Sequence, residues 1–270
     1  MNPAVTRATR SVIAVVILIV MLFPLYWMLN LSLQPRGTGL ATDWIPRALN
    51  FDGYAAAVRD QGNSLLVSLI VSLISVVVTL LIATPAAYAL AQFRLRGVNV
   101  VLLVLAVSQM IPGIVIANSL YGAYNSLGLL NSFGGLILAD ASHSIPFAIL
   151  IMRVTMQGIP AAVLEAAKID GANQVRTFLS VAIPLARNGV ITAALFSFLF
   201  SWSDFLFALT LTTTEQLRPV TLGIYEYLGA DQTDWNAVMA TAVFAALPAT
   251  VLLLVAQRYV AAGAMSGSVK

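Results

Sequence analysis

Six long apolar stretches dominate this sequence. They cover about residues 11–33, 64–92, 98–121, 133–156, 188–211 and 235–259. A helix needs roughly 20 mostly apolar residues to cross the hydrocarbon of a bilayer, and each stretch is long enough. Their apolar residues run on continuously rather than alternating, which disfavours a β-barrel. Only helices and closed barrels satisfy their backbone in lipid. The pattern therefore predicts an all-α integral membrane protein with six transmembrane helices.

The composition agrees with a membrane protein. Hydrophobic residues make up 60% of the 270 and charged residues only 9%, and the mean hydropathy is +0.91. An average soluble chain carries about 25% charged residues, because it must cover its outside with polar groups. The first apolar stretch is too long for the core of a signal peptide and lacks a small-residue cleavage site. We expect it to be retained as a span.

Residue usage also excludes several kinds of chemistry. The chain has no cysteine and one histidine, His143, so disulfides, a Cys nucleophile and a zinc site of His and Cys are excluded. No G-x-x-x-x-G-K-S/T phosphate loop occurs, so we expect no ATP site in this chain. The sequence therefore predicts no metal, no cofactor and no catalytic residues in it.

The charged residues predict an orientation. With six spans both termini share one side, and that side would hold ten of the 14 basic residues: Arg7, Arg10, Arg94, Arg96, Arg153, Lys168, Arg176, Arg187, Arg258 and Lys270. The other side would hold four: Arg36, Arg47, Arg59 and Arg218. It would also hold seven acidic residues: Asp43, Asp52, Asp60, Glu215, Glu226, Asp231 and Asp234. Basic residues favour the cytoplasmic side, so both termini are predicted to be cytoplasmic. No clustered basic patch indicates nucleic-acid binding.

The stretch 157–187 is the longest predicted cytoplasmic connection, and it is not apolar throughout. Pro160 suits the first turn of a helix, and Gly171 suits its left-handed end. A second helical pattern covers 173–182, and Pro184 is expected to break it before the fifth span. Small side chains at the corner would let another protein approach closely: Ala166, Ala167, Gly171 and Ala172. An ordinary amphipathic linker is the alternative interpretation.

This connection carries a motif. Glu165-Ala166-Ala167 is followed after three residues by Gly171, and after nine more by Val181-Ala182-Ile183-Pro184. It resembles the EAA loop of ABC importer permeases, with Val181 and Ile183 as conservative departures, and it lies between spans four and five as in that family. The resemblance implies the type I importer permease fold. It assigns ATPase coupling to Glu165, Ala166, Ala167, Asp170, Gly171 and Pro184, on a coupling helix over 165–171.

Shorter matches extend the resemblance along nearly the whole chain. They are Gln-Met-Ile-Pro at 109–112, Leu-Gly-Leu-Leu-Asn-Ser at 127–132, Ser-Trp-Ser-Asp-Phe at 201–205 and Gln-Arg-Tyr at 257–259. The sequence resembles the shorter, six-span permeases of the carbohydrate-uptake branch, of the maltose permease type. One departure is Gly53, which stands in Asp52-Gly53-Tyr54 where that branch usually has Asn-Tyr.

The resemblance also implies an assembly. One permease domain would cover 1–270, with a core of five helices over about 64–259 and an additional N-terminal helix over 1–33. It would lie in a bacterial cytoplasmic membrane beside a second, different permease. Two copies of a cytoplasmic ATPase would bind ATP and Mg, and an extracytoplasmic binding protein would deliver the substrate. Because that protein largely chooses the substrate, the sequence does not name the sugar.

Four residues are candidates for the translocation pathway: Asp140, His143, Trp202 and Asp204. Ionisable groups are costly in lipid, so they usually face a cavity or a partner. We expect Asp140 to be able to bond His143 three residues on, and Asp204 to meet sugar hydroxyls with Trp202 as a stacking face. The alternative is that these groups pair or cap helices within the bundle.

Two other functional classes use the same residues. An ion-coupled secondary transporter would move protons through Asp140, His143 and Asp204, but it usually shows an inverted repeat, which is not visible here. An intramembrane enzyme would need Asp140 and Asp204 as a pair. Prolines within the predicted spans are expected to kink their helices or free a carbonyl: Pro85, Pro112 and Pro146.

Overall fold

The computed structural model describes residues 3–35, 43–227 and 234–266. Three charged residues used above to predict the orientation lie outside the described residues: Arg36, Asp231 and Lys270. The side chains of four further residues named above also lie outside the description: Arg7, Glu226, Arg258 and Tyr259.

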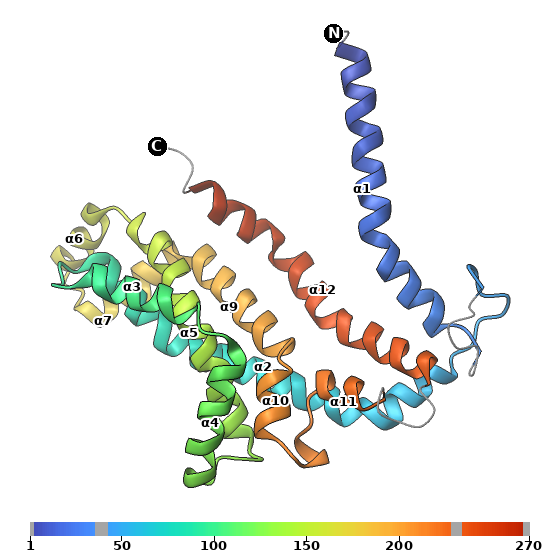
Figure 1. The fold of residues 1–270 in the computed structure, drawn as a ribbon. Coiled ribbons are helices and arrows are strands. Elements are labelled where there is room, and N and C mark those ends of the chain that lie inside the picture. Colours follow the sequence, from blue (N-terminus) through green and yellow to red (C-terminus); the bar gives the residue numbers. More distant parts are fainter. Residues whose placement is uncertain (1–2, 36–42, 228–233, 267–270) are drawn as a thin grey trace. The chain divides into compact units, whose positions relative to one another are not determined.

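Throughout the described part of the chain, every element is a helix (Figure 1), which confirms the predicted all-α class. In chain order they are α1 (Pro3–Ser32), α2 (Asp52–Gln92), α3 (Val98–Ser108), α4 (Gly113–Leu127), α5 (Phe133–Gln157), α6 (Ala161–Ile169), α7 (Gln174–Thr177), the π-helical turn η1 (Phe178–Ala182), α8 (Ile183–Leu185), α9 (Arg187–Trp202), α10 (Leu206–Leu211), the 3-10 turn η2 (Glu215–Leu217), α11 (Val220–Tyr227) and α12 (Trp235–Ser266).

Four of these helices are long and apolar enough to cross a membrane by themselves, over Thr9–Ser32, Asp52–Gln92, Phe133–Gln157 and Trp235–Gln257. Two bent pairs pass the same test together. Val98–Ser108 and Gly113–Leu127 meet at 95°, and Gln174–Leu185 and Arg187–Trp202 meet at 78°. The described residues thus hold four spans, or up to six if each bent pair is one span. The six-span count stays a prediction.

Two of the predicted continuous spans are broken. The stretch 98–121 divides into α3 and α4 just before Pro112, which agrees with the expected effect of a proline. The stretch 188–211 divides into α9 and α10 at residues 203–205, where no proline stands. Pro85 and Pro146, by contrast, lie inside helices α2 and α5, which continue through them.

The chain forms two compact units. One comprises Met1–Gly62 and Gly223–Leu247, and the other comprises Asn63–Leu222 and Pro248–Lys270. Helices α2 and α12 contribute to both. The expectation of one permease domain stays a prediction, and each unit is described by itself.

Two apolar clusters form the core of the larger unit. The first joins α2, α5, α6 and α9 through residues such as Ala87, Met152 and Leu164. The second joins α2, α4, α5 and α10 through residues such as Val71, Ile137 and Phe207. Helices α5 and α9 pack very closely at Gly189, because a Cβ there would lie 2.4 Å from Oγ1 of Thr155.

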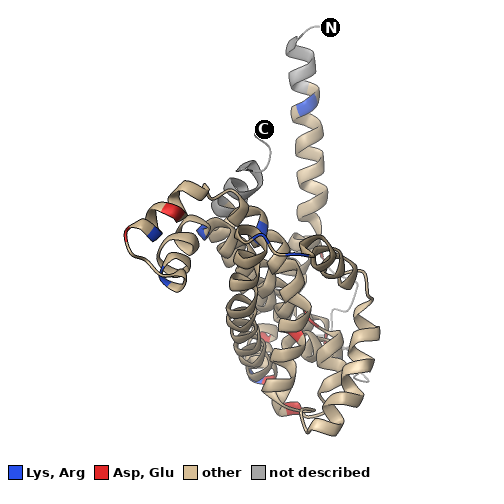
Figure 2. Cartoon of the chain, turned by 90° about the vertical axis from the view of Figure 1, so that its left-hand side faces the viewer, with Lys and Arg blue, Asp and Glu red and all other residues tan. Residues whose placement is uncertain are grey.

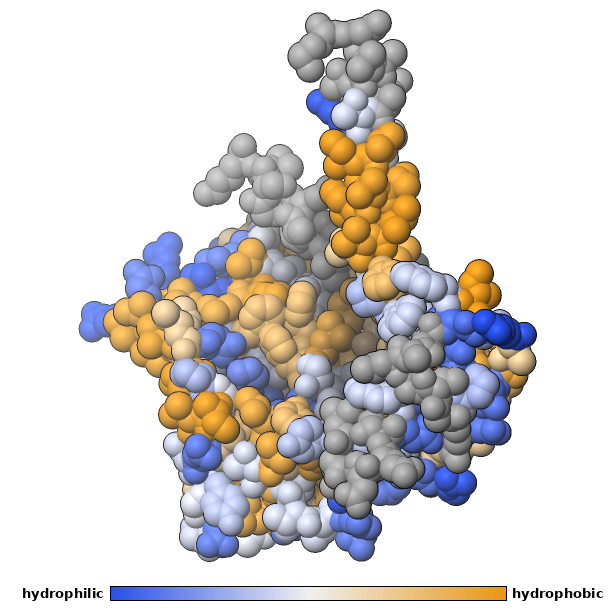
Figure 3. Space-filling view, turned by 45° about the vertical axis from the view of Figure 1, so that its right-hand side comes forward, coloured by the Kyte–Doolittle hydropathy of each residue, from blue (hydrophilic) through white to orange (hydrophobic). Residues whose placement is uncertain are grey.

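Helix α1 belongs to the smaller unit and exposes apolar side chains around its whole circumference. Val12, Ile17 and Met21, for example, are all more than half exposed. In Figure 3 this helix is a column of hydrophobic residues. Such a surface is typical of a helix that has lipid or another membrane helix as its neighbour.

Hydrogen bonds from one side chain join the start of α12 to the end of α1 and the residues after it in the smaller unit. The amide nitrogen of Asn236, at the start of α12, donates to the carbonyl oxygens of Leu31, Ser32 and Gln34 at 3.2, 2.9 and 2.6 Å. The first two carbonyls belong to the last turn of α1, where helical partners run out, and the third lies two residues beyond the helix. Gly53 makes room for the Asn236 side chain, because a Cβ there would lie 2.0 Å from Oδ1 of Asn236. The close approach explains why glycine suits this position.

We therefore expect Gly53→Ala to lower the free energy of unfolding by about 1–3 kcal/mol, because the added methyl collides with a tethered side chain. Thermal unfolding of the detergent-purified protein measures the change. Gly62→Ala is the matched control on the same helix, since a Cβ there meets nothing within 4 Å. It should raise stability by about 0.5–1 kcal/mol, as alanine does within helices. Equal effects of the two variants would contradict the role assigned to Gly53.

Candidate functional site

The residues of the EAA motif lie on α6 and in the turn that follows it. Pro160 precedes the helix in an extended conformation, with φ −62° and ψ 131°, one residue earlier than the predicted first turn. At the other end Gly171 has φ +82°, which confirms the predicted left-handed stop. Its N–H bonds the carbonyl of Lys168 at 3.0 Å, and the N–H of Ala172 bonds that of Ala167 at 2.9 Å. These two bonds form a Schellman motif, which closes the helix end.

The chain then returns toward the membrane helices through α7, η1 and α8. Asn173 caps α7 by accepting the N–H of Arg176 at 2.8 Å. Pro184 was expected to break this helix, but it lies inside α8 and the direction changes at Ala186. Proline has no N–H to bond the carbonyl four residues earlier, and the chain immediately before it takes the wider π-helical turn.

The motif residues present one face to the core and one to the outside. Leu164 is 6% exposed and packs in the first core cluster. Glu165, Ala166, Asp170 and Gly171 are exposed, as is Pro184, and Ala167 is half-buried. Ile169 stands out because 86% of this large apolar side chain is exposed. The segment therefore joins the helix bundle through Leu164 and offers an apolar surface beside it.

Basic residues gather at the end of the larger unit that carries α6 and α7. Figure 2 shows the Lys and Arg positions, in blue, on these helices and at the neighbouring helix ends. Arg153 donates a hydrogen bond to the backbone carbonyl of Leu90 at 3.2 Å. Lys168 lies in the last turn of α6. This distribution is the one expected of a cytoplasmic face.

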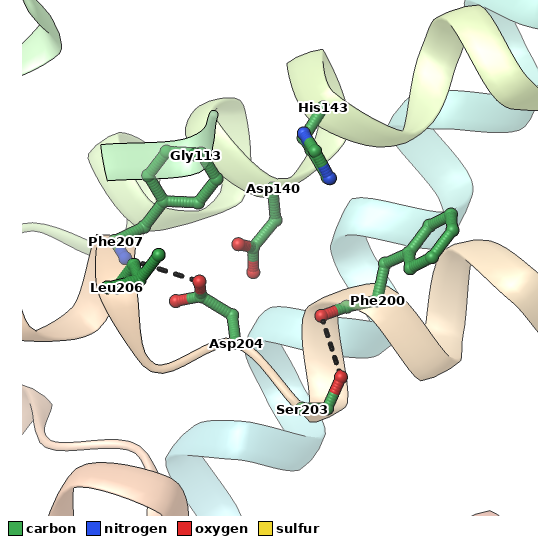
Figure 4. A pocket seen from close by; sticks show the side chains of 8 residues that line it. All are labelled: Gly113, Asp140, His143, Phe200, Ser203, Asp204, Leu206 and Phe207. Atoms are coloured by element: carbon green, nitrogen blue, oxygen red, sulfur yellow. Dashed lines mark hydrogen bonds between the residues drawn. The ribbon is translucent and has the colours of Figure 1, made fainter. Parts of the chain in front are cut away.

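A second candidate site is a pocket of about 190 Å³ at the other end of α9 (Figure 4). Its lining comes from three places: the start of α4, the middle of α5 and the break between α9 and α10. The residues are Gly113, Asp140, His143, Phe200, Ser203, Asp204, Leu206 and Phe207. Three of the four predicted pathway residues thus meet in one pocket.

Asp204 caps α10. Its two carboxylate oxygens accept the N–H groups of Phe207 and Ala208 at 3.2 and 3.0 Å. The first N–H groups of a helix have no partner within it, and their positive dipole favours a carboxylate. The hydroxyl of Thr221 also donates to the carbonyl oxygen of Asp204. The break within the predicted fifth span is therefore a capped helix start.

Asp140 is buried in α5, with 4% of its surface exposed. Its Oδ2 accepts the hydroxyl of Ser201 on α9 at 2.5 Å. The expected bond from His143 to Asp140 was wrong. The imidazole instead packs edge-on against Phe200 and Phe207, with ring centres 5.8 and 6.1 Å away. Side chains three residues apart share a face but need not converge, and the aromatic neighbours hold this ring apart.

Trp202 does not line the pocket, against the expectation that it would offer a stacking face. Its indole is buried and stacks on Phe198 with ring centres 5.5 Å apart. Phe200 and Phe207 take the aromatic positions instead, and they were not predicted. The only sign of this aromatic lining in the sequence was position: Phe200 lies four residues before Asp204, and Phe207 lies three residues after it. No three His, Cys, Asp or Glu side chains in the described chain come together as metal ligands.

We expect Ser201→Ala to lower the free energy of unfolding by about 1–3 kcal/mol, because a buried carboxyl group would lose its hydrogen-bond donor. Ser203→Ala is the matched control two residues away. That hydroxyl is exposed and bonds only carbonyls of its own helix, so its loss should change stability by no more than about 0.5 kcal/mol. Thermal unfolding of both variants tests this; a silent Ser201→Ala would contradict the pairing of α5 and α9 through Asp140.

The fold is shared with solved membrane subunits of importers. A chain of a bacterial ABC transporter involved in the import of the acidic polysaccharide alginate superposes with a TM-score of 0.82 at 23% identity, over 95% of this chain and 97% of that one. A chain of the methionine ABC transporter MetNI superposes with a TM-score of 0.59 at 17% identity, over 80% of this chain and 99% of that one. The fold is thus one that chains of ABC transporters share.

Sequence comparison gives the family. Residues 83–265 match the model of the binding-protein-dependent transport system inner membrane component. The trehalose transport system permease protein SugB of Mycobacterium tuberculosis is 32% identical over 92% of both chains. The sulfoquinovosyl glycerol permease protein SmoH of Agrobacterium fabrum is 32% identical over 98% of this chain and 94% of its own. The chain belongs to this family of multi-pass membrane transport subunits. Nothing in these comparisons supports the ion-coupled alternative.

Proposed function

We propose that this chain is a permease subunit of an ATP-driven importer that moves a carbohydrate across the bacterial cytoplasmic membrane by alternating access. The family supports the import mechanism, and the sugars in the names of SugB and SmoH support the substrate class. The proposal rests above all on the exposed end of α6, where the helix stops at Gly171 with φ +82°.

In this proposal α6 is the coupling helix. Its exposed apolar side chain at Ile169 and its small residues at the corner suit a groove of a cytoplasmic ATPase subunit. On its other face Leu164 packs with Met152, Met156 and Ala182 in the first core cluster. A push on α6 is then transmitted through close packing, because protein interiors deform little.

The assembly would contain four further chains. A second permease would complete the pathway, two copies of the ATPase would bind ATP and Mg on the cytoplasmic side, and a binding protein would dock outside. Both termini of this chain would be cytoplasmic, and six spans would cross the membrane. The gathering of basic side chains at the α6 and α7 end supports that orientation.

We expect Gly171→Leu to reduce sugar-stimulated ATP hydrolysis and uptake at least about tenfold, because leucine disfavours the left-handed backbone by about 1–2 kcal/mol and enlarges the docking corner. The reconstituted transporter with its binding protein is the assay system. Gly128→Leu is the matched control: that glycine ends α4, has φ +67° and, like Gly171, has open space around it. It should leave coupling intact.

The pair of glycine variants separates coupling from folding. If Gly171→Leu assembles normally and keeps full stimulated hydrolysis and uptake, the assignment of α6 fails. If wild-type uptake proceeds without hydrolysis and follows a proton gradient, the importer proposal itself fails.

Because the chain has no cysteine, single cysteines can test the orientation. Gln174→Cys, exposed at the start of α7, should react with a membrane-impermeant maleimide only after cells are opened. Glu215→Cys, whose position is highly exposed, should react on intact spheroplasts. Labelling of both in detergent controls for reactivity, and the reverse pattern in cells would contradict the cytoplasmic assignment.

A further inference from the structure

Two helix breaks meet at the pocket. The first lies between α3 and α4, where the helices bend by 95° and Gly113 begins the second. The other lies between α9 and α10, at Ser203, Asp204 and Phe205. Backbone that leaves the helix at membrane depth persists only where it packs in protein or lines a cavity. Two such breaks on one pocket indicate a binding site within the bundle.

The polar groups of the pocket are mainly acceptors. Figure 4 shows the carboxylates of Asp140 and Asp204 turned toward one another across it. Two facing carboxyl groups in a buried pocket do not both stay ionised, so the pair carries about one negative charge, and its unprotonated oxygens accept hydrogen bonds from a ligand that donates. Neither Lys nor Arg lines the pocket to balance a negative ligand. Ser201 holds one oxygen of Asp140, and the α10 N–H groups hold both oxygens of Asp204, which keeps both carboxyl groups oriented.

The apolar part of the lining is aromatic. Phe207 is 4% exposed and packs edge-on with His143, which also meets Phe200. Rigid rings beside carboxylates suit a ligand with an apolar C–H face and a rim of hydroxyl donors, as a sugar ring has. At about 190 Å³ the pocket lies below the roughly 300–1,000 Å³ of sites for drug-sized ligands, so it suits one ring.

We propose that this pocket is a carbohydrate contact site of this chain, which takes a neutral sugar ring through its hydroxyl groups and rejects a negatively charged one. The inference rests on the proposed function and specifies its substrate class. The physical reason is charge: an anionic sugar would bring a second negative charge beside the one that Asp140 and Asp204 share in a poorly solvated pocket.

The test removes charge and keeps shape. In the double variant Asp140→Asn with Asp204→Asn, the amide oxygen at 140 can still accept from Ser201. The single amide oxygen at 204 can keep one of the two bonds from the α10 N–H groups. Glu215→Gln is the control, because it removes a carboxylate that does not line the pocket, on a side chain that is 86% exposed and lies 3.9 Å from Arg218. Copurification with the partner subunits shows that each variant assembles.

The measurement is direct ligand binding to the assembled transporter in nanodiscs, without binding protein or ATP, by saturation-transfer NMR. The probes are methyl glucoside and methyl glucuronoside, which differ by one carboxylate. Wild type and Glu215→Gln should bind the glucoside at least about tenfold more tightly than the glucuronoside. The double variant should bind the glucoside roughly tenfold or more weakly, since a bond to a charged group is lost, and should no longer discriminate against the glucuronoside.

Loss of discrimination is decisive where the double variant copurifies with its partners and still binds the glucoside saturably, because a misfolded variant that binds neither probe shows no preference either. Equal binding of both probes to wild type, no binding of either, or unchanged discrimination in the double variant would overturn the inference. ATP-driven uptake by the same preparations separates the two proposals. If uptake is intact in every variant with unchanged preference, the contact site fails while the importer function stands. If wild type shows no ATP-driven sugar uptake, the proposed function fails with it.

Discussion

The backbone's need for hydrogen-bond partners governs this structure, because lipid supplies none. At several places where a helix of the larger unit stops, a side chain supplies a hydrogen-bond partner, while α6 ends on bonds between backbone groups. Asp204 accepts the N–H groups at the start of α10, and Gln109 donates across the α3 break to the carbonyl of His143 at 3.3 Å. Asn131, in the left-handed region at φ 52°, accepts the N–H of Thr213. Polar side chains therefore stand at these breaks, and a pocket forms between two of them.

Helix α9 connects the two candidate sites. It begins directly after the bend at Ala186, where the coupling segment ends, and it finishes at Trp202, beside the break that forms the pocket. Its 16 residues form one rigid element about 24 Å long. It is locked to α5 at both ends, by the close approach of Gly189 to Thr155 and by the bond from Ser201 to Asp140. A tilt of α9 imposed at its α6 end would therefore also displace the end of α9 that lies beside the pocket.

The sequence predicted what depends on local pattern. The apolar stretches became helices, and Gly171 ended α6 in the left-handed conformation that its position indicated. The break at 203–205 was missed, because the residues around it are apolar and contain no proline. It exists because the Asp204 side chain replaces the missing helical acceptors. The aromatic lining by Phe200 and Phe207 was missed for a related reason: in an apolar helix every aromatic residue looks like packing.

The sequence alone determined the membrane environment, the helical class, the left-handed end of α6 at Gly171 and the family. Each rests on composition or on spacing within one segment, since a helix bonds residue i to i−4 and its amphipathic pattern is local. The tertiary structure decided which intramembrane polar groups face a pocket and which ones bond other helices within the bundle. Asp140 meets Ser201 across 61 positions, and Asn236 meets Leu31 across 205. Such partners are chosen by how helices pack, which no single segment encodes.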